Sequence, residues 1–109
     1  MRGRDLSNTT ESEMKVFTFV RDLCARHPAI QRAILFGSRA RGDHHERSDF
    51  DLAIDAPGFS DEEWARFALE LREKAPTLCG LDLVRLESGT SVDLSGKIRQ
   101  EGVDLYVRK

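Results

Sequence analysis

The chain has 109 residues, of which 39% are hydrophobic and 33% are charged, the size and composition of one folded domain rather than of a disordered segment. The formal net charge of −2 gives no overall positive field, so we do not expect a long nucleic-acid duplex as the partner. No apolar run approaches the length of a membrane span or of a signal peptide, so we expect a cytoplasmic protein without a membrane segment.

The chain begins with ten polar residues that show no periodicity, and we predict that residues 1–10 are disordered. Residues 11–109 are predicted to form a single domain. Its first helix is expected at Glu11–Arg26, ending before Pro28. The apolar residues at helical spacing are Val16, Phe17, Val20, Leu23 and Cys24. His27, at the end of this helix, is interpreted as a C-terminal cap rather than as a catalytic group.

Two apolar runs flank a polar loop in the next part of the chain. The run Ala33–Phe36 predicts a strand that leads into Gly37-Ser38, and Ser38–Arg41 predicts a single helical turn ended by Gly42. The second strand is expected at Phe50–Ile54, after a loop. A turn cluster, Asp55-Ala56-Pro57-Gly58, closes it, so we interpret Asp55 as the strand's end rather than as a metal ligand.

The second half of the chain predicts two more helices and two more strands. Ser60 and Glu63 form a capping box that starts a helix reaching about Lys74. Trp64 falls on the apolar stripe of this helix and needs no stacking role. The remaining elements are a strand at Leu81–Leu86, a helix capped by Thr90 that runs through Gln100, and a strand at Val103–Val107. Cys24 and Cys79 lie far apart in apolar segments and are interpreted as reduced core residues.

The predicted element order is α-β-α-β-α-β-α-β, which indicates an α/β domain with a mixed sheet of about four strands flanked by helices. Gly37-Ser38 ends the first strand, whereas Asp49 and Asp51 begin the second. These ends meet only if the two strands are antiparallel. A full helix separates the second and third strands, which favours a parallel crossover and would bring Asp82 beside the other two carboxylates.

The three carboxylates predict a metal site. Asp49 and Asp51, at positions i and i+2 of a strand, point to one face about 6.6 Å apart. Hard divalent cations prefer such oxygen ligands. With Asp82 as the third acid, the set is able to hold two Mg²⁺ ions, one near an attacking hydroxyl and one on a triphosphate. The alternatives are a solvated strand start for Asp49 and Asp51, and an exposed strand entry for Asp82.

The Gly37-Ser38 turn is predicted to bind the phosphates of a nucleotide through backbone N–H groups and the Ser38 hydroxyl. Ser38 is also a candidate N-cap of the short helical turn, and this role does not exclude phosphate contact. Arg39 and Arg41 are predicted to contact phosphate as well, with a solvated face of the turn as the equal alternative. Arg47 lies just ahead of the carboxylates, and pairing with them is a weaker hypothesis for it.

The remaining polar and aromatic residues favour structural interpretations. His44 and His45 lack the spacing of metal ligands, so a surface loop is the preferred interpretation. Tyr106 is interpreted as an edge-strand residue, with self-modification as the open alternative.

The sequence Gly37-Ser38, ten intervening residues, then Asp49-Phe50-Asp51 resembles the signature of the DNA polymerase β nucleotidyltransferase superfamily. The resemblance spans about residues 12–109 and includes Asp82 and the closing Ile98…Glu101-Gly102-Val103…Leu105-Tyr106. The small size is similar to the minimal nucleotidyltransferase (MNT) group. The resemblance implies the polymerase-β-like fold, a metal-binding pair at Asp49 and Asp51, the third acid at Asp82, and a nucleotide-holding Gly37 and Ser38.

The MNT resemblance also implies a reaction and a partner. Many members act as antitoxins of HEPN-domain toxins, so the implied activity is transfer of AMP from ATP to a tyrosine of such a toxin, with two Mg²⁺ ions. Two alternatives remain: nucleotidyl transfer to a small molecule such as an aminoglycoside with a partner chain, and a binding module that masks the toxin without catalysis. Homo- or hetero-oligomer formation, and the choice of ATP over other nucleotides, stay open.

Overall fold

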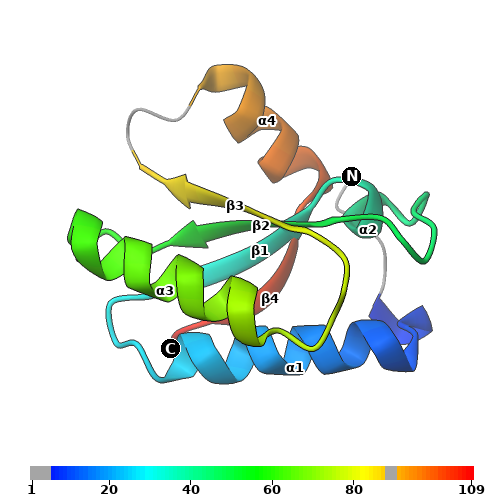
Figure 1. Ribbon diagram of the computed structural model, residues 1–109. Helices are drawn as coiled ribbons and strands as arrows, with labels where there is room; N and C mark the ends of the chain where they lie inside the picture. The colour runs from blue at the N-terminus through cyan, green and yellow to red at the C-terminus, as the bar shows by residue number, and fades with distance from the viewer. Residues whose placement is uncertain (1–5, 88–90) are drawn as a thin grey trace.

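The computed structural model describes residues 6–87 and 91–109, and its elements follow the predicted order (Figure 1). They are a 3₁₀ turn (Leu6–Asn8), α1 (Glu11–Ala25), β1 (Arg32–Phe36), α2 (Ser38–Arg41), β2 (Phe50–Asp55), α3 (Asp61–Lys74), β3 (Leu81–Leu86), α4 (Val92–Glu101) and β4 (Val103–Val107). No helix in these described ranges is both long and apolar enough to span a membrane.

The strands form one mixed sheet in the order β3-β2-β1-β4. Strand β1 is antiparallel to both β2 and β4, whereas β2 and β3 are parallel. The predicted fold class and the predicted directions of the first three strands are therefore confirmed. The helix α3 forms the crossover between the two parallel strands, as a parallel connection requires.

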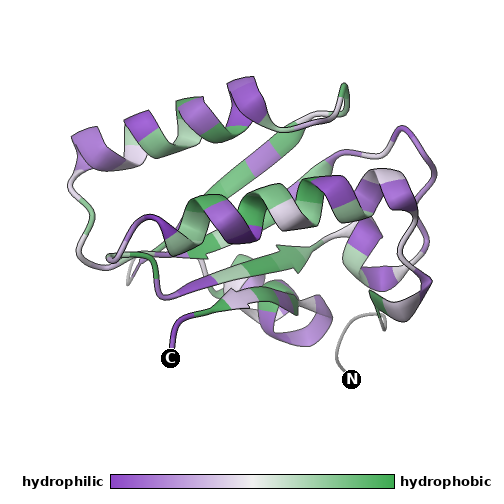
Figure 2. Ribbon diagram, turned by 90° about the horizontal axis from the view of Figure 1, so that it is seen from below, coloured by the Kyte–Doolittle hydropathy of each residue, from purple (hydrophilic) through white to green (hydrophobic). Residues whose placement is uncertain are grey.

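Helices lie on both faces of the sheet (Figure 1), and apolar side chains are buried on each face. Alternation along β1 sends Ala33 and Leu35 into the larger cluster, with residues of α1 and α3, and sends Ile34 and Phe36 into the smaller one, with α4. Figure 2 shows the helices alternating between hydrophilic and hydrophobic residues, whereas the strands are mostly hydrophobic. One face of the sheet thus carries two helices and the other carries one.

The N-terminal side chains are more ordered than expected. Thr10 caps α1 in a capping box with Glu13, because the Thr10 hydroxyl accepts from the Glu13 N–H and the Glu13 carboxylate accepts from the Thr10 N–H. Leu6 packs against the large cluster. The prediction of disorder is therefore wrong for residues 6–10, while residues 1–5 lie outside the described residues. The predicted capping box of Ser60 and Glu63 is confirmed.

Two predicted caps differ from the structure. The carbonyl oxygens of Cys24 and His27, at the end of α1, accept hydrogen bonds from the guanidinium of Arg108. The His27 ring instead packs edge-on against two phenylalanine rings, of Phe59 and Phe67. At α4 the capping hydroxyl belongs to Ser91, which accepts from the Leu94 N–H. Thr90, the predicted cap, lies outside the described residues.

Candidate functional site

The strand arrangement brings the three predicted acids to one end of the sheet. Asp51 and Asp82 are directly paired residues of the parallel strands β2 and β3. Asp49 immediately precedes β2, and its Oδ1 accepts a hydrogen bond of 3.2 Å from the Gly80 N–H, just before β3. The juxtaposition deduced from strand directions alone is therefore present in the structure.

The Asp51 carboxyl lies in an environment that disfavours its negative charge. Its side chain is partly buried, and this burial is the largest cause that raises its pKa above the usual value. The charges of Asp82 and Asp49 raise it further, and Lys97 on α4 partly opposes them. A cation near Asp51 would offset both the burial and the neighbouring negative charges.

Gly37 is the point at which the Gly-Ser turn meets this acidic cluster. Its φ of 75° lies in the left-handed region, and a Cβ at this position would collide with the carboxylate of Asp51. Only glycine therefore fits both the backbone and the space. The adjacent Ser38 hydroxyl makes no hydrogen bond to the described part of the chain, so it is available to a ligand.

The donor set suits Mg²⁺ by its chemistry, since all three side chains offer carboxylate oxygens. The side chains are not gathered around one point, however. Within residues 6–87 and 91–109, no group of three His, Cys, Asp or Glu residues is close enough to hold a metal ion. The hydrogen bond from Gly80 holds Asp49 toward the start of β3. This hydrogen bond engages Oδ1, so Oδ2 is the Asp49 oxygen that stays available to a cation.

Arg39 differs from the prediction, which was either contact with phosphate or a solvent-exposed side chain. Its side chain is buried, with Nη1 lying 2.8 Å from Oε2 of Glu13. Nε and Nη2 donate to the carbonyl oxygens of Ser48 and Glu46, and the guanidinium lies 4.0 Å from the centre of the Phe50 ring. Through these contacts the Arg39 guanidinium holds the loop that precedes Asp49 against α1.

The histidines and Arg47 of this loop also have structural contacts. His44 is not on the free surface, because its Nε2 lies 3.2 Å from Oε2 of the buried Glu13. His45 is exposed, as expected, and its Nδ1 accepts from the Arg47 N–H. The described residues show no ion pair between Arg47 and the three acids, so that hypothesis has no support in the structure.

Arg41 remains compatible with a role toward phosphate, since it is half exposed at the end of α2. Its Nε donates to Asp43 at 3.0 Å, and its Nη1 donates to both carboxylate oxygens of Glu101 at 3.1 Å. These two carboxylates raise the pKa of Arg41, so its charge is secure. A second donor reaches Glu101, because the Gly37 N–H donates to its Oε2 at 3.3 Å.

Two residues of this region were missed as partners in the sequence analysis, although each carried a signal. Glu13 falls on the apolar stripe of α1, with Val16, Phe17 and Val20 at the following helical positions. A carboxylate on a buried stripe indicates a buried cationic partner. Glu101 is an acid at a helix C-terminus, where a carboxylate is disfavoured unless something compensates it.

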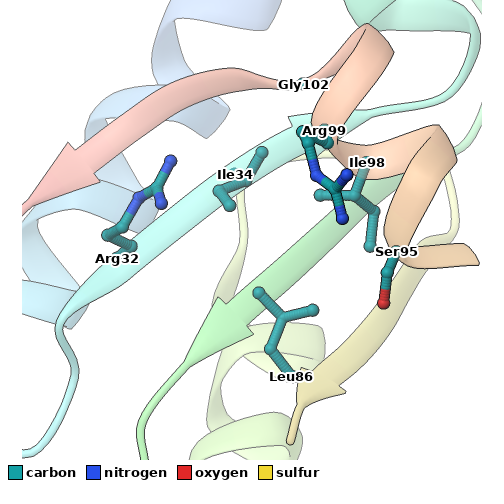
Figure 3. Close-up of a pocket in the computed structure, with 7 residues that line it drawn as sticks. All are labelled: Arg32, Ile34, Leu86, Ser95, Ile98, Arg99 and Gly102. Atoms are coloured by element: carbon teal, nitrogen blue, oxygen red, sulfur yellow. The ribbon is translucent and has the colours of Figure 1, made fainter. Parts of the chain in front are cut away.

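One hollow of the described surface lies away from the acids. A cavity of about 290 Å³ opens between α4 and the sheet, on the face that carries one helix (Figure 3). It is lined by Arg32, Ile34, Leu86, Ser95, Ile98, Arg99 and Gly102. No predicted site residue lines it, so the candidate site is the open acidic edge of the sheet and not this cavity.

Comparison with known proteins identifies both a family and a fold. Residues 20–109 match the family described as Polymerase beta, Nucleotidyltransferase. No curated protein matches the chain by sequence.

Solved structures of toxin–antitoxin pairs contain similar chains. A chain in the crystal structure of a toxin–antitoxin with AMP-PNP is 26% identical, with a TM-score of 0.68 over 85% of this chain and 74% of that one. A chain of the toxin–antitoxin MntA–HepT is 23% identical, with a TM-score of 0.62 over 84% and 70%. A third belongs to a tri-AMPylated Shewanella oneidensis HEPN toxin in complex with MNT antitoxin, at 22% identity and a TM-score of 0.61 over 89% and 73%.

Proposed function

This chain belongs to the polymerase beta nucleotidyltransferase family, and from that premise we propose that it transfers AMP from ATP to a hydroxyl of a HEPN toxin. The acceptor hydroxyl is proposed to be that of a tyrosine. By this modification the chain would serve as the antitoxin of a toxin–antitoxin pair.

One observation carries the proposal: the pairing of Asp51 with Asp82 beside the Gly37-Ser38 turn. The register of β2 and β3 puts the two acids side by side, and Gly37 has no room for a side chain because Asp51 lies against it. A nucleotide whose phosphates bind the turn would therefore have its α-phosphorus near carboxylates. A nucleotidyl transfer needs a phosphate-binding turn and a group of carboxylates at the same place.

The proposed reaction is a displacement at the α-phosphorus of ATP. The acceptor hydroxyl oxygen forms a bond to this phosphorus, and the bond to the bridging oxygen of the pyrophosphate breaks. Pyrophosphate leaves, and the proton of the hydroxyl passes to Asp82, the most exposed of the paired acids. Ser38 and Arg41 bind the phosphates, which fixes the α-phosphorus in line with the acceptor.

Asp49, Asp51 and Asp82 would hold Mg²⁺ in this reaction. When bound, the metal neutralises charge on the triphosphate and favours the ionised form of the acceptor hydroxyl. Burial, and then the charges of Asp82 and Asp49, raise the pKa of Asp51, and a cation bound there would offset both causes.

The choice of partner rests on similar structures. One similar structure contains the ATP analogue AMP-PNP, and another contains an AMPylated HEPN toxin with an MNT antitoxin. Both complexes support the proposal that a chain of this family modifies a toxin with AMP.

The proposal is tested by intact-mass analysis of the cognate HEPN protein after incubation with this chain, ATP and Mg²⁺. We expect the HEPN protein to gain the mass of AMP, and to gain none with the double variant Asp49→Asn/Asp51→Asn. In cells, that variant should also fail to neutralise the toxin. Full neutralisation by the variant would instead mean that the chain acts by masking the toxin, and the catalytic proposal would be wrong.

A further inference from the structure

Glu101 is the last residue of α4, and its position is unusual for an acid. The C-terminus of a helix carries a partial negative charge, so a carboxylate there is normally destabilising. The Glu101 side chain is nevertheless only 17% exposed and does not extend into solvent. A carboxylate buried at a helix C-terminus needs specific partners that compensate its charge.

The first partner is the backbone of the Gly37 turn. The ladder between β1 and β4 ends where Leu35 pairs with Val103, two residues before Gly37. Beyond this point the Gly37 N–H has no strand partner on that side, and it donates to Oε2 of Glu101 at 3.3 Å. The side chain of Glu101 thus extends the hydrogen bonding of the sheet by one step into the turn.

The second partner is Arg41, at the other end of the short helix α2. Its Nη1 donates to both oxygens of Glu101 at 3.1 Å, and its Nε donates to Asp43. Nη2 makes no hydrogen bond to the described residues. Two anchored nitrogens fix the plane of the guanidinium and leave one N–H₂ group for a ligand.

We propose that Glu101 is a positioning residue of the nucleotide site, an inference that rests on the proposed nucleotidyl transfer. It holds the two ends of the Gly37–Arg41 turn at once, so that Ser38 and Arg41 are presented together to the phosphates. Because these contacts are made before any nucleotide arrives, the turn is ordered in advance and binding loses less conformational entropy. The opposing view is that Glu101 competes with phosphate for Arg41 and Gly37.

Three substitutions separate these two views, measured by calorimetric titration of the full chain with AMP-PNP and Mg²⁺. The shorter side chains of Glu101→Ala and Glu101→Asp do not contact the Gly37–Arg41 turn. We expect each variant to bind AMP-PNP about tenfold more weakly, which corresponds to the loss of roughly one charge-assisted hydrogen bond. Glu101→Gln keeps an acceptor oxygen in place, so its affinity should stay within about threefold of the wild type. A competing carboxylate predicts the opposite sign, with tighter binding by the Ala and Gln variants.

Asp104→Ala is the matched control, since it removes a carboxylate from an arginine pair on the neighbouring β4. Oδ1 of Asp104 lies 2.7 Å from Nη2 of Arg32, away from the turn. The control should leave the affinity for AMP-PNP unchanged. Equal affinities for the wild type and for Glu101→Ala would overturn the inference.

A second readout does not depend on nucleotide binding. Amide hydrogen exchange at Gly37 should be faster in Glu101→Ala and Glu101→Asp than in the wild type, and close to wild type in Glu101→Gln. If the wild type itself does not bind AMP-PNP, the proposed function fails, and the exchange rate of Gly37 still decides whether Glu101 holds the turn. Unchanged exchange in both the Ala and Asp variants would contradict the inference by itself.

Discussion

Asp51 and Asp82 stand opposite each other as paired residues of two parallel strands, so their carboxylates share one face of the sheet. The same Asp51 carboxylate lies against Gly37, at the start of the Gly-Ser turn. Asp51 is therefore the point where the acidic edge and the proposed phosphate-binding turn meet. Substitutions of Asp51 should therefore change both the stability of the free protein and its stabilisation by Mg²⁺.

Replacing Asp51 with Asn should stabilise the free protein at neutral pH. Burial and the two neighbouring acids raise the pKa of Asp51, so its ionised form costs free energy in the folded state. Thermal unfolding should show a melting temperature a few degrees higher for Asp51→Asn, in keeping with the common trade-off between stability and function. Mg²⁺ should raise the melting temperature of the wild type much more than that of the variant.

The same substitution has a defined pH dependence. A carboxyl whose pKa is raised on folding binds its proton more tightly in the folded state, so its penalty is present above the folded pKa and disappears below the ordinary value of about 3.9. The advantage of Asp51→Asn should therefore shrink as the pH falls from 7 toward 4. An advantage that grows in acid, or a variant less stable than the wild type at pH 7, would contradict the described environment of Asp51.

Gly37→Ala should destabilise the protein and abolish nucleotide binding. The added methyl group would collide with the Asp51 carboxylate, and the φ of 75° is strained for any residue with a Cβ. Gly96→Ala is the matched control, because a Cβ at Gly96 meets nothing within 4 Å in the middle of α4. The control should gain about 0.5–1 kcal/mol in the free energy of unfolding, measured in urea. If Gly37→Ala left the free energy of unfolding unchanged, the turn would have more room at Gly37 than the structure shows.

Arg39→Ala should be among the most destabilising single changes. It removes the guanidinium from the buried Glu13 carboxylate, and loss of one partner of a buried ion pair costs about 3–5 kcal/mol. Arg66→Ala breaks an exposed pair with Glu62 on α3 and should change the free energy of unfolding by less than about 0.5 kcal/mol. Denaturation in urea compares the two. Equal effects would rule out the buried role of Arg39.

The two thiols should differ in reactivity. Burial raises the pKa of the Cys24 thiol to about 12, so the reactive thiolate is scarce and shielded, whereas Cys79 is partly exposed. Iodoacetamide should add one group to the native protein, at Cys79, and two groups in concentrated urea. Peptide mapping identifies the modified residue. Native labelling of Cys24 ahead of Cys79 would mean that the helix α1 opens readily.

The fold was predictable because its signals are local. Apolar runs bounded by turn residues located all four strands, and the need to bring Gly37 and Asp51 together set the directions of the first two strands. The parallel pairing of β2 and β3 followed from the helix between them. The shift of register between Ala33 and Ile34 in the pairing with β4 had no such signal, since it depends on how two distant segments meet.

The sequence analysis placed Asp51 and Asp82 side by side, as the strand register does, but it was wrong about Arg39. In the sequence, Arg39 and Arg41 are alike, two positions apart in a polar turn. What separates them is a partner elsewhere: Glu13, 26 residues earlier, holds Arg39, and Glu101, 60 residues later, contacts Arg41. Pairings over such distances depend on tertiary packing. The metal and phosphate roles of the site residues remain predictions of the account.

The central claim, that AMP rather than phosphate is transferred to a partner protein, is tested most directly with labelled ATP. The purified chain, its cognate HEPN protein and Mg²⁺ are incubated in parallel with ATP labelled at the α-phosphate or at the γ-phosphate. The account predicts that only the α-label enters the HEPN protein, that pyrophosphate is released in equal amount, and that Asp51→Asn abolishes both. Label from the γ-phosphate in the HEPN protein, or no label from either position, would contradict it.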